Sequence, residues 1–313
     1  MQKLLAPAPD ESKPVSTAER IGPSPVPKPV QTSAFTTAFG CPREFLNNRF
    51  IYLVISPRAR GLSIGVNLNP DKHCNFDCPY CEVNRSLPAG EQALDVDVMT
   101  AELQATLALA CDGRLRELPC YRNVQDELLK LRHVTLSGDG EPTLCPNFLE
   151  AVHAVIHVRA LGEFPFFKIV LITNATGLDL PQVQQGLKFF TAQDEIWAKL
   201  DAGTQAEMNR VNRPDCSLEK VLANILLTAR RRPVVIQSLF PLLNGQEPRA
   251  QEVEQYAQRL KELKENGAQI SLVQIYSATR PTPHSECGHL PLKSLSRIAQ
   301  AVRHATGLKA EVF

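Results

Sequence analysis

Residues 62–81 read LSIGVNLNPDKHCNFDCPYC, a short apolar run followed by three closely spaced cysteines. The run LSIGVNL (62–68) predicts a buried β-strand. Cys74, Cys78 and Cys81 follow it in the spacing CxxxCxxC, whereas the remaining cysteines of the nine are scattered singly. A strand that ends in a polar loop of this kind is typical of α/β sheets and barrels, in which reactive groups gather at the C-terminal strand ends.

The composition is that of a soluble globular protein. The 313 residues include 43% apolar and 21% charged residues, with a net charge of +1. No stretch approaches the roughly 18 uninterrupted apolar residues of a membrane span, and the small net charge offers no global attraction for nucleic acid or membrane. The first residues, MQKLLAPAPDESK, lack a signal-peptide h-region, so we expect a cytoplasmic protein whose cysteines bind metal rather than form disulfides.

The chain divides into two parts by composition. Residues 1–44 are rich in proline, serine and threonine and predict a disordered leader. Residues 45–313 alternate short apolar runs with amphipathic stretches, which predicts repeated βα units in an α/β fold, a partial (β/α)6 TIM-like barrel of parallel strands with a C-terminal extension. The predicted strands are 62–68, 133–137, 168–173, 195–201, 233–240 and 269–276, with a short strand in 308–313.

Amphipathic stretches between these strands predict helices near 98–111, 146–160, 180–190, 217–231, 248–265 and 292–305. Asp179 and Ser217 are the candidate N-caps, and Gly267 and Gly307 the candidate C-terminal stops. The segment 112–132 predicts a loop with one short helix. In such a fold the cysteine loop, GDGEPT (138–143), TNATG (173–177) and KLDAGT (199–204) all follow strands, so we expect them at one end of the barrel.

Three neighbouring thiolates limit the kind of metal site. A structural zinc site uses four ligands, commonly two CxxC-type pairs, and the second pair is missing here. His73 could supply a nitrogen, but it directly precedes Cys74. An iron–sulfur cluster of four irons usually takes four thiolates, so three leave one iron open.

The stretch from Cys74 to Cys81, with the aromatic Tyr80 before the third cysteine, resembles the motif of the radical S-adenosylmethionine (radical SAM) superfamily. The likeness covers roughly residues 45–313 and is nearest to the 4-demethylwyosine synthases and their bacterial relatives. SGDGEPTL, LITNATG, WAKLDAGT…NRVNRP and VQIYSATRP all look like blocks of that group.

This resemblance implies that Cys74, Cys78 and Cys81 bind a [4Fe-4S] cluster whose open iron chelates S-adenosyl-L-methionine. It further implies cofactor contacts from the loop after the second predicted strand, where Gly138 and Gly140 permit close backbone approach. Glu141 adds a negative charge or a structural hydrogen bond there. The remaining candidate contacts are Tyr80, Thr173, Asn174, Lys199 and Asp201.

Several of these candidates have structural alternatives. Asn174 could cap a turn, and Lys199 and Asp201, two positions apart on one strand, could simply pair with each other. Arg280 could hold a substrate phosphate or carboxylate, or be solvated. Weaker candidates for adenine contacts are Gln237, Ser238, Tyr276 and Ser277.

The chain departs from the demethylwyosine synthases upstream of the motif. That family has a second cluster and a Schiff-base lysine, whereas only Cys41 and four lysines precede Cys74 here. We therefore do not expect the wyosine reaction. The stretch His284-Ser-Glu-Cys287-Gly-His289 could be a metal site, although an ordinary loop is the simpler interpretation.

The resulting hypothesis is a radical SAM enzyme, an oxidoreductase that abstracts hydrogen from a small-molecule or nucleoside-type substrate. The alternatives are a radical modifier of tRNA or of a protein partner and, more remotely, a non-catalytic iron–sulfur binding or electron-transfer module. A reductant protein such as flavodoxin or ferredoxin is the expected partner, and no membrane association is expected.

Overall fold

The computed structural model describes residues 45–280 and 282–313, so the predicted leader (1–44) lies outside the described residues. An eight-stranded sheet runs in the order β1-β2-β3-β4-β5-β6-β8-β10, and β7 pairs with β9. The strands are β1 Ile51–Ser56, β2 Gly61–Asn67, β3 Leu131–Ser137, β4 Lys168–Thr173, β5 Glu195–Lys199, β6 Val234–Leu239, β7 Leu242–Leu243, β8 Ile270–Tyr276, β9 Cys287–Gly288 and β10 Ala310–Val312. The α-helices are α1 Val96–Cys111, α2 Asp126–Leu129, α3 Phe148–Ala160, α4 Pro181–Leu187, α5 Gln205–Val211, α6 Leu218–Ala229, α7 Ala250–Glu265 and α8 Leu292–Thr306.

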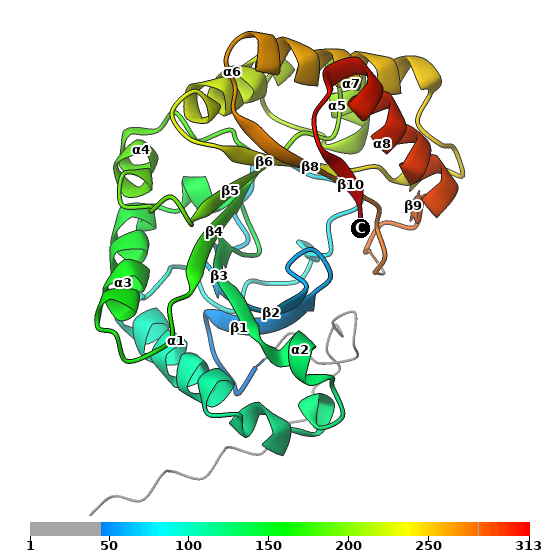
Figure 1. The fold of residues 1–313 in the computed structure, drawn as a ribbon. Helices are drawn as coiled ribbons and strands as arrows, with labels where there is room; N and C mark the ends of the chain where they lie inside the picture. The colour runs from blue at the N-terminus through cyan, green and yellow to red at the C-terminus, as the bar shows by residue number, and fades with distance from the viewer. Residues whose placement is uncertain (1–44, 281) are drawn as a thin grey trace, which may run out of the picture.

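The sheet forms an open, mostly parallel barrel. From β2 to β10 every neighbouring pair is parallel, and the strands follow chain order. Helices α1, α3, α4 and α6 lie outside the curved sheet, whose two edges face each other across a gap between β1 and β10 (Figure 1). This confirms the predicted α/β partial barrel, with the six predicted strands as β2, β3, β4, β5, β6 and β8.

Strand β1 was not predicted. IYLVIS (51–56) pairs antiparallel with β2 from Ile51 opposite Val66 to Ser56 opposite Gly61, so it forms a hairpin at the sheet edge. Its burial alternates, because one face packs into the protein and the other lines the barrel interior. The turn 57–60 between β1 and β2 reaches the other edge of the sheet, where Arg60 pairs with Glu311 of β10.

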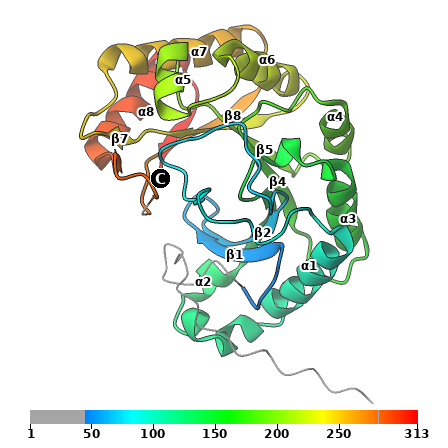
Figure 2. The same cartoon turned by 180° about the vertical axis from the view of Figure 1, so that it is seen from behind.

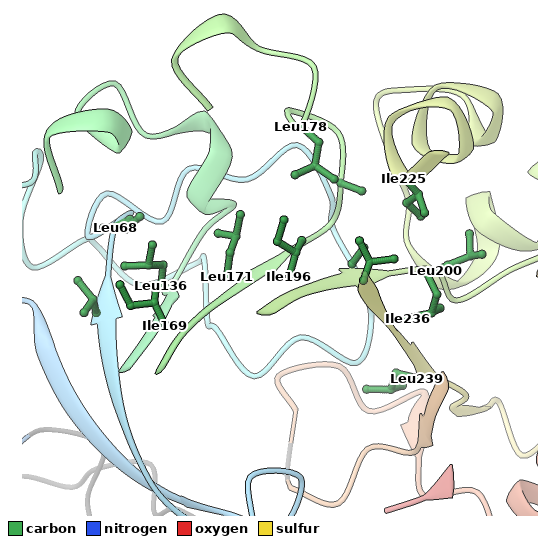
Figure 3. Close-up of a cluster of buried hydrophobic side chains, with 14 of the residues drawn as sticks. Leu68, Leu136, Ile169, Leu171, Leu178, Ile196, Leu200, Ile225, Ile236 and Leu239 are labelled. Atoms are coloured by element: carbon green, nitrogen blue, oxygen red, sulfur yellow. The ribbon is translucent and has the colours of Figure 1, made fainter. Parts of the chain in front are cut away.

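Side-chain alternation gives the sheet two different faces. The main core joins the outward positions of the strands to the helices, and Figure 3 shows Leu136, Leu171 and Ile196 on neighbouring strands together with Ile225 of α6. The inward positions form a separate, smaller apolar cluster at Val170, Trp197 and Val235, with Ile172 and Leu272 packed against it. The polar inward positions Ser63, Thr135 and Ser137 lie on β2 and β3 and leave space inside the barrel.

Most helix predictions are confirmed within a few residues. Ser217 caps α6 by accepting from the Lys220 amide, and Gly307 ends α8 in the left-handed conformation. The prediction of Asp179 as an N-cap was wrong. Leu180 is the N-cap of α4, and the Asp179 carboxylate accepts from Asn224 Nδ2 at 3.0 Å. Helix α5 was missed, since GTQAEMNRVNR is short and only weakly amphipathic. The segment 112–132 holds two short 3-10 helices, Arg114–Glu117 and Pro119–Tyr121, besides α2.

Within the described residues, no helix is both long and apolar enough to cross a membrane.

Candidate functional site

The loop that carries Cys74, Cys78 and Cys81, called here the cysteine loop, follows β2 and crosses one end of the barrel, as the cyan segment of Figure 2 shows. Hydrogen bonds join it to the segment after α5: the Asp77 amide donates to Asn212 O at 3.1 Å, and the Asp215 amide donates to Asn75 O at 3.1 Å. Phe76 also pairs with Pro214 as an isolated bridge. The loop is therefore held by a segment more than 130 positions away in the chain, which the sequence did not indicate.

Each of the three thiols has a hydrogen-bond donor. The Phe76 amide donates to Cys74 Sγ at 3.4 Å, Asn212 Nδ2 to Cys78 Sγ at 3.5 Å, and Arg85 Nη1 to Cys81 Sγ at 3.3 Å. Burial raises the pKa of Cys74 to about 11 and that of Cys78 to about 12. Because the buried thiols resist ionisation by themselves, their thiolate forms need a nearby positive charge such as a metal.

The loop GDGEPT (138–143) after β3, called here the glycine loop, packs directly against the cysteine loop. A Cβ on Gly140 would lie 1.9 Å from His73 O, so only glycine fits at this contact. The next amide, that of Glu141, donates to the same His73 carbonyl at 2.9 Å. Gly138 meets Asn67 in a similar way, with a Cβ 2.2 Å from Asn67 Oδ1. The two loops thus support each other through backbone contact.

Glu141 is buried and its carboxylate is fully engaged within the protein. It accepts from Thr143 N at 3.1 Å, Thr143 Oγ1 at 2.6 Å, Asn174 N at 2.7 Å and Thr173 Oγ1. Burial raises the pKa of Glu141, while the hydrogen bonds from Asn174 and Thr143 act in the opposite direction. The geometry matches the structural hydrogen-bond role of Glu141, because these contacts tie the glycine loop to the end of β4.

The TNATG loop contacts the cysteine loop through Asn75. Asn174 Nδ2 donates to Asn75 Oδ1 at 2.8 Å, and Asn75 Nδ2 donates to Thr176 Oγ1 at 3.1 Å. Thr173 faces Glu141, so its hydroxyl and that of Thr176 both serve contacts between loops. Asn75 was not among the site residues predicted from the sequence, and its only signal was its position between two of the motif cysteines.

Asp201 lies at the centre of a buried polar network under the cysteine loop. Its carboxylate accepts from the Tyr80 hydroxyl, from Asn212 Nδ2 at 2.8 Å and from the Leu239 amide at 2.7 Å. Burial and the neighbouring Asp201 charge raise the pKa of Tyr80 well above its ordinary value. The network explains why Tyr80 is buried: its ring adjoins the barrel interior while its hydroxyl is held by Asp201.

Lys199 completes this network from β5. Its Nζ lies 3.6 Å from Asp201 Oδ2 and donates to Tyr276 Oη at 3.2 Å. Burial acts against the charged form of Lys199, yet Asp201 and Tyr276 together hold its pKa above the usual range. The predicted shared side of Lys199 and Asp201 is therefore confirmed, and the lysine is a cation with a counter-ion.

The inside of the barrel contains a cavity of about 300 Å³. Tyr80, Cys81, Gly138, Lys199 and Tyr276 all contribute to its wall, so three of the four predicted loops meet there. The cavity also has an apolar side from Ile172, Trp197 and Leu239 and a hydroxyl-rich side from β1, β2 and β3.

The weaker sequence candidates fall in different places. Tyr276, Ser277 and Arg280 line the cavity, and Arg280 pairs with Glu82 at 2.6 Å. Gln237 and Ser238, the other two candidates for adenine contacts, are buried and do not line the cavity. Ser238 instead donates to Leu200 O at 2.6 Å, which makes it part of the core.

Comparison with known proteins finds similar sequences among the UPF0026 proteins. No protein-family model matches the chain. Two UPF0026 proteins of Helicobacter pylori strains are 30% identical over 185 residues (58% of this chain, 52% of the relative) and 27% identical over 233 residues (72% and 66%). The chain thus spans between about half and two thirds of the length of these relatives.

Solved structures resemble the chain at the level of fold. A radical SAM methyltransferase from Sphaerobacter thermophilus has a TM-score of 0.55 at 18% identity, covering 84% of this chain and 68% of that one. Streptococcus suis SuiB bound to S-adenosylmethionine gives 0.53 at 13% identity (78% and 49%), and TYW1 with a lysine–pyruvate adduct gives 0.51 at 16% (80% and 75%). The chain has the fold of the radical SAM enzymes.

Proposed function

We propose that this protein is a radical SAM enzyme in which Cys74, Cys78 and Cys81 bind a [4Fe-4S] cluster. The main support is the packing of the three-cysteine loop against the glycine loop at the C-terminal strand ends, with Gly140 against His73 O. A cluster held by these cysteines would supply the electron for reductive cleavage of S-adenosyl-L-methionine to a 5'-deoxyadenosyl radical, which is the chemistry needed to abstract hydrogen from a substrate. The proposed domain covers residues 45–313.

The donor set suits a cluster better than a single metal ion. Among residues 45–280 and 282–313, no three Cys, His, Asp or Glu side chains converge closely enough to hold one ion. A zinc site needs such convergence, whereas in a four-iron cluster each thiolate binds a different iron.

Residues around the thiols are arranged to support thiolate charge. Arg85 brings a guanidinium to Cys81 Sγ, and its second nitrogen donates to Asp139 O at 3.4 Å. Asn212 places an amide against Cys78 Sγ. Charge-assisted donors of this kind stabilise anionic sulfur, so Arg85 and Asn212 join the cysteines as proposed site residues.

The proposed cofactor contacts follow from which groups adjoin the cavity. Gly138, Lys199 and the ring of Tyr80 line it and are the leading candidates to contact S-adenosyl-L-methionine. Asp201 positions Tyr80 and Lys199. Gly140, Glu141, Thr173 and Asn174 act by holding the loops in place.

The cavity volume favours a small substrate. About 300 Å³ is at the low end of the range of about 300–1,000 Å³ for ligand pockets. Because S-adenosyl-L-methionine is proposed to occupy part of the same space, the remainder suits a small molecule or one nucleoside-type group better than an inserted segment of a macromolecule. Salt-sensitive retention of tRNA at physiological ionic strength would favour the tRNA alternative instead. A soluble reductant such as flavodoxin or ferredoxin, in the cytoplasm, completes the proposal.

The test is anaerobic reconstitution with iron and sulfide, followed by measurement of 5'-deoxyadenosine formed under dithionite. We expect cleavage in the wild type and none in Cys78→Ala, while Cys145→Ala keeps it. Cys145 is a matched control because it is also buried but lies outside the cysteine loop. A full cluster with no spectral response to S-adenosyl-L-methionine and no cleavage would refute the enzyme and favour a binding module.

A further inference from the structure

The charged side chains that line the barrel cavity are not balanced. Three cations contribute to its wall, namely Arg58, Lys199 and Arg280. Lys199 pairs with Asp201 at 3.6 Å and Arg280 with Glu82 at 2.6 Å. Among the residues that the structure describes, Arg58 has no carboxylate partner, so one positive charge in the cavity is uncompensated.

Arg58 reaches the cavity across the open seam of the barrel. It lies in the turn between β1 and β2, and its guanidinium carbon stands 4.3 Å from the ring centroid of Tyr276 on β8. Its Nε is buried and has no hydrogen-bond partner. A buried guanidinium N–H normally finds an acceptor, because leaving a charged donor unpaired is unfavourable. The side chain as a whole is only partly buried, and no hydrogen bond joins its other guanidinium nitrogens to a described residue, so these nitrogens are available to an anionic group in the cavity.

The Tyr276 ring fixes the direction of this guanidinium. Lys199 Nζ lies 5.6 Å from the same ring and donates to its hydroxyl, so Tyr276 stands between two cations. Stacking on an aromatic face leaves the in-plane N–H groups of an arginine free to bind an oxyanion in bidentate fashion. Arg58 thus combines a defined orientation with unused donors.

The wall near Arg58 has chemistry that suits the rest of a small ligand. Trp197 and Ile172 offer an apolar surface, and the indole N–H of Trp197 is already satisfied by Glu195 at 2.7 Å. The hydroxyls of Ser63 and Thr135 bond each other at 2.8 Å and present further polar atoms. Burial lowers the pKa of His133, which lies edge-on to Trp197, to about 3, so this imidazole adds no further cation to the wall at neutral pH.

We propose that Arg58 binds the carboxylate or phosphate of the substrate, and that an apolar or aromatic body of that substrate lies against Trp197 and Ile172. The proposal rests on the proposed function, because Cys81 lines the same cavity and brings the ligand near the cluster site. Carboxylate and phosphate share the geometry that a guanidinium fork recognises. The substrate class is therefore a small organic acid or phosphate ester with an apolar part.

The experiment titrates the reconstituted full chain by calorimetry with phenyl phosphate, benzoate and the uncharged benzyl alcohol. The chain has one tryptophan, Trp197, so quenching of its fluorescence in the cluster-free protein reports occupancy of the cavity. We expect at least one anion to bind, with Arg58→Ala weakening it tenfold or more and leaving benzyl alcohol unchanged. The stronger of the two anions tells carboxylate from phosphate.

Arg60→Ala is the matched control. Arg60 lies in the same turn and is also cationic, but it pairs with Glu311 and does not line the cavity. It should bind the anions as the wild type does. Should Arg58→Ala fail to fold, Arg58→Gln retains the stem against Tyr276 while removing the charge, and circular dichroism identifies the folded variants.

Three results would overturn the assignment. The first is no Arg58-dependent binding of either anion at millimolar concentration, and the second is binding of benzyl alcohol as tight as that of the anions. The third is competition of both anions with S-adenosyl-L-methionine, together with an equal loss of affinity for S-adenosyl-L-methionine in the Arg58 variants. The last would mean that Arg58 holds the cofactor carboxylate. Because the titration requires no cleavage, absence of 5'-deoxyadenosine would refute the proposed function separately from the anion site.

Discussion

Replacing Gly140 with alanine tests the contact between the glycine loop and the cysteine loop. The added Cβ would lie 1.9 Å from His73 O and 2.6 Å from Asn69 Cβ, and neither neighbour is the end of a flexible side chain. Relief requires the loops to separate, which also breaks the hydrogen bond from the Glu141 amide to His73 O. Overpacking costs about 1–3 kcal/mol and the lost hydrogen bond about 0.5–1.5 kcal/mol, so we expect a loss of about 1.5–4.5 kcal/mol in unfolding free energy.

Urea unfolding followed by Trp197 fluorescence measures this loss, and iron content after reconstitution measures its effect on the site. We expect reduced iron binding in Gly140→Ala, because His73 immediately precedes Cys74. Gly90→Ala is the control: a Cβ there meets nothing within 4 Å, so stability and iron content should stay near wild type. Wild-type stability and a full cluster in Gly140→Ala would refute the argued contact.

Two further predictions concern stability away from the cysteine loop. Burial, with Lys168 and Arg58 adding to it, lowers the pKa of His133 from 6.5 to about 3, so the unfolded state binds the extra proton between these values. Stability should then fall as pH decreases from about 6.5, by up to about 1.4 kcal/mol per pH unit for this residue, and His133→Gln should flatten that slope in urea titrations at several pH values. Arg159 and Asp194 form a buried ion pair at 2.7 Å, so Arg159→Leu should cost about 3–5 kcal/mol, whereas Lys261→Leu, which removes an exposed pair, should cost less than about 1 kcal/mol. Equal effects of the two leucine variants would contradict the burial argument.

Much of the fold could be predicted because its signals are local. Each of the six parallel strands is a short apolar run followed by a polar loop, so the alternation of strands and helices can be predicted from local sequence alone. Strand β1 escaped prediction because IYLVIS precedes β2 by only a short turn and lies outside that alternation. Its antiparallel pairing follows from the hairpin, a connection that the βα pattern does not contain.

The site divides in the same way. Neighbouring positions in the chain carry the cysteine spacing, the glycine loop and the alternate positions of Lys199 and Asp201, and the sequence was enough to single them out. Asn212 contacts Cys78 and Arg58 contacts Tyr276, and both partners lie far away in the chain. The sequence around Asn212 and Arg58 contains no pattern that predicts these contacts. The roles of Glu141 and Thr173 likewise became clear only from the hydrogen bonds between their loops.

Strand periodicity and ligand spacing are properties of a few consecutive residues, so the kind of fold and the three thiols could be predicted from the amino-acid sequence alone. Which polar groups are satisfied and which face the cavity depends on the curled sheet, because the curvature brings the turn between β1 and β2 up to Tyr276 of β8 across the open seam. That closure leaves Arg58 stacked on Tyr276 without an acceptor. The net charge of the cavity depends on side chains from several separate segments, so no single stretch of the sequence predicts it.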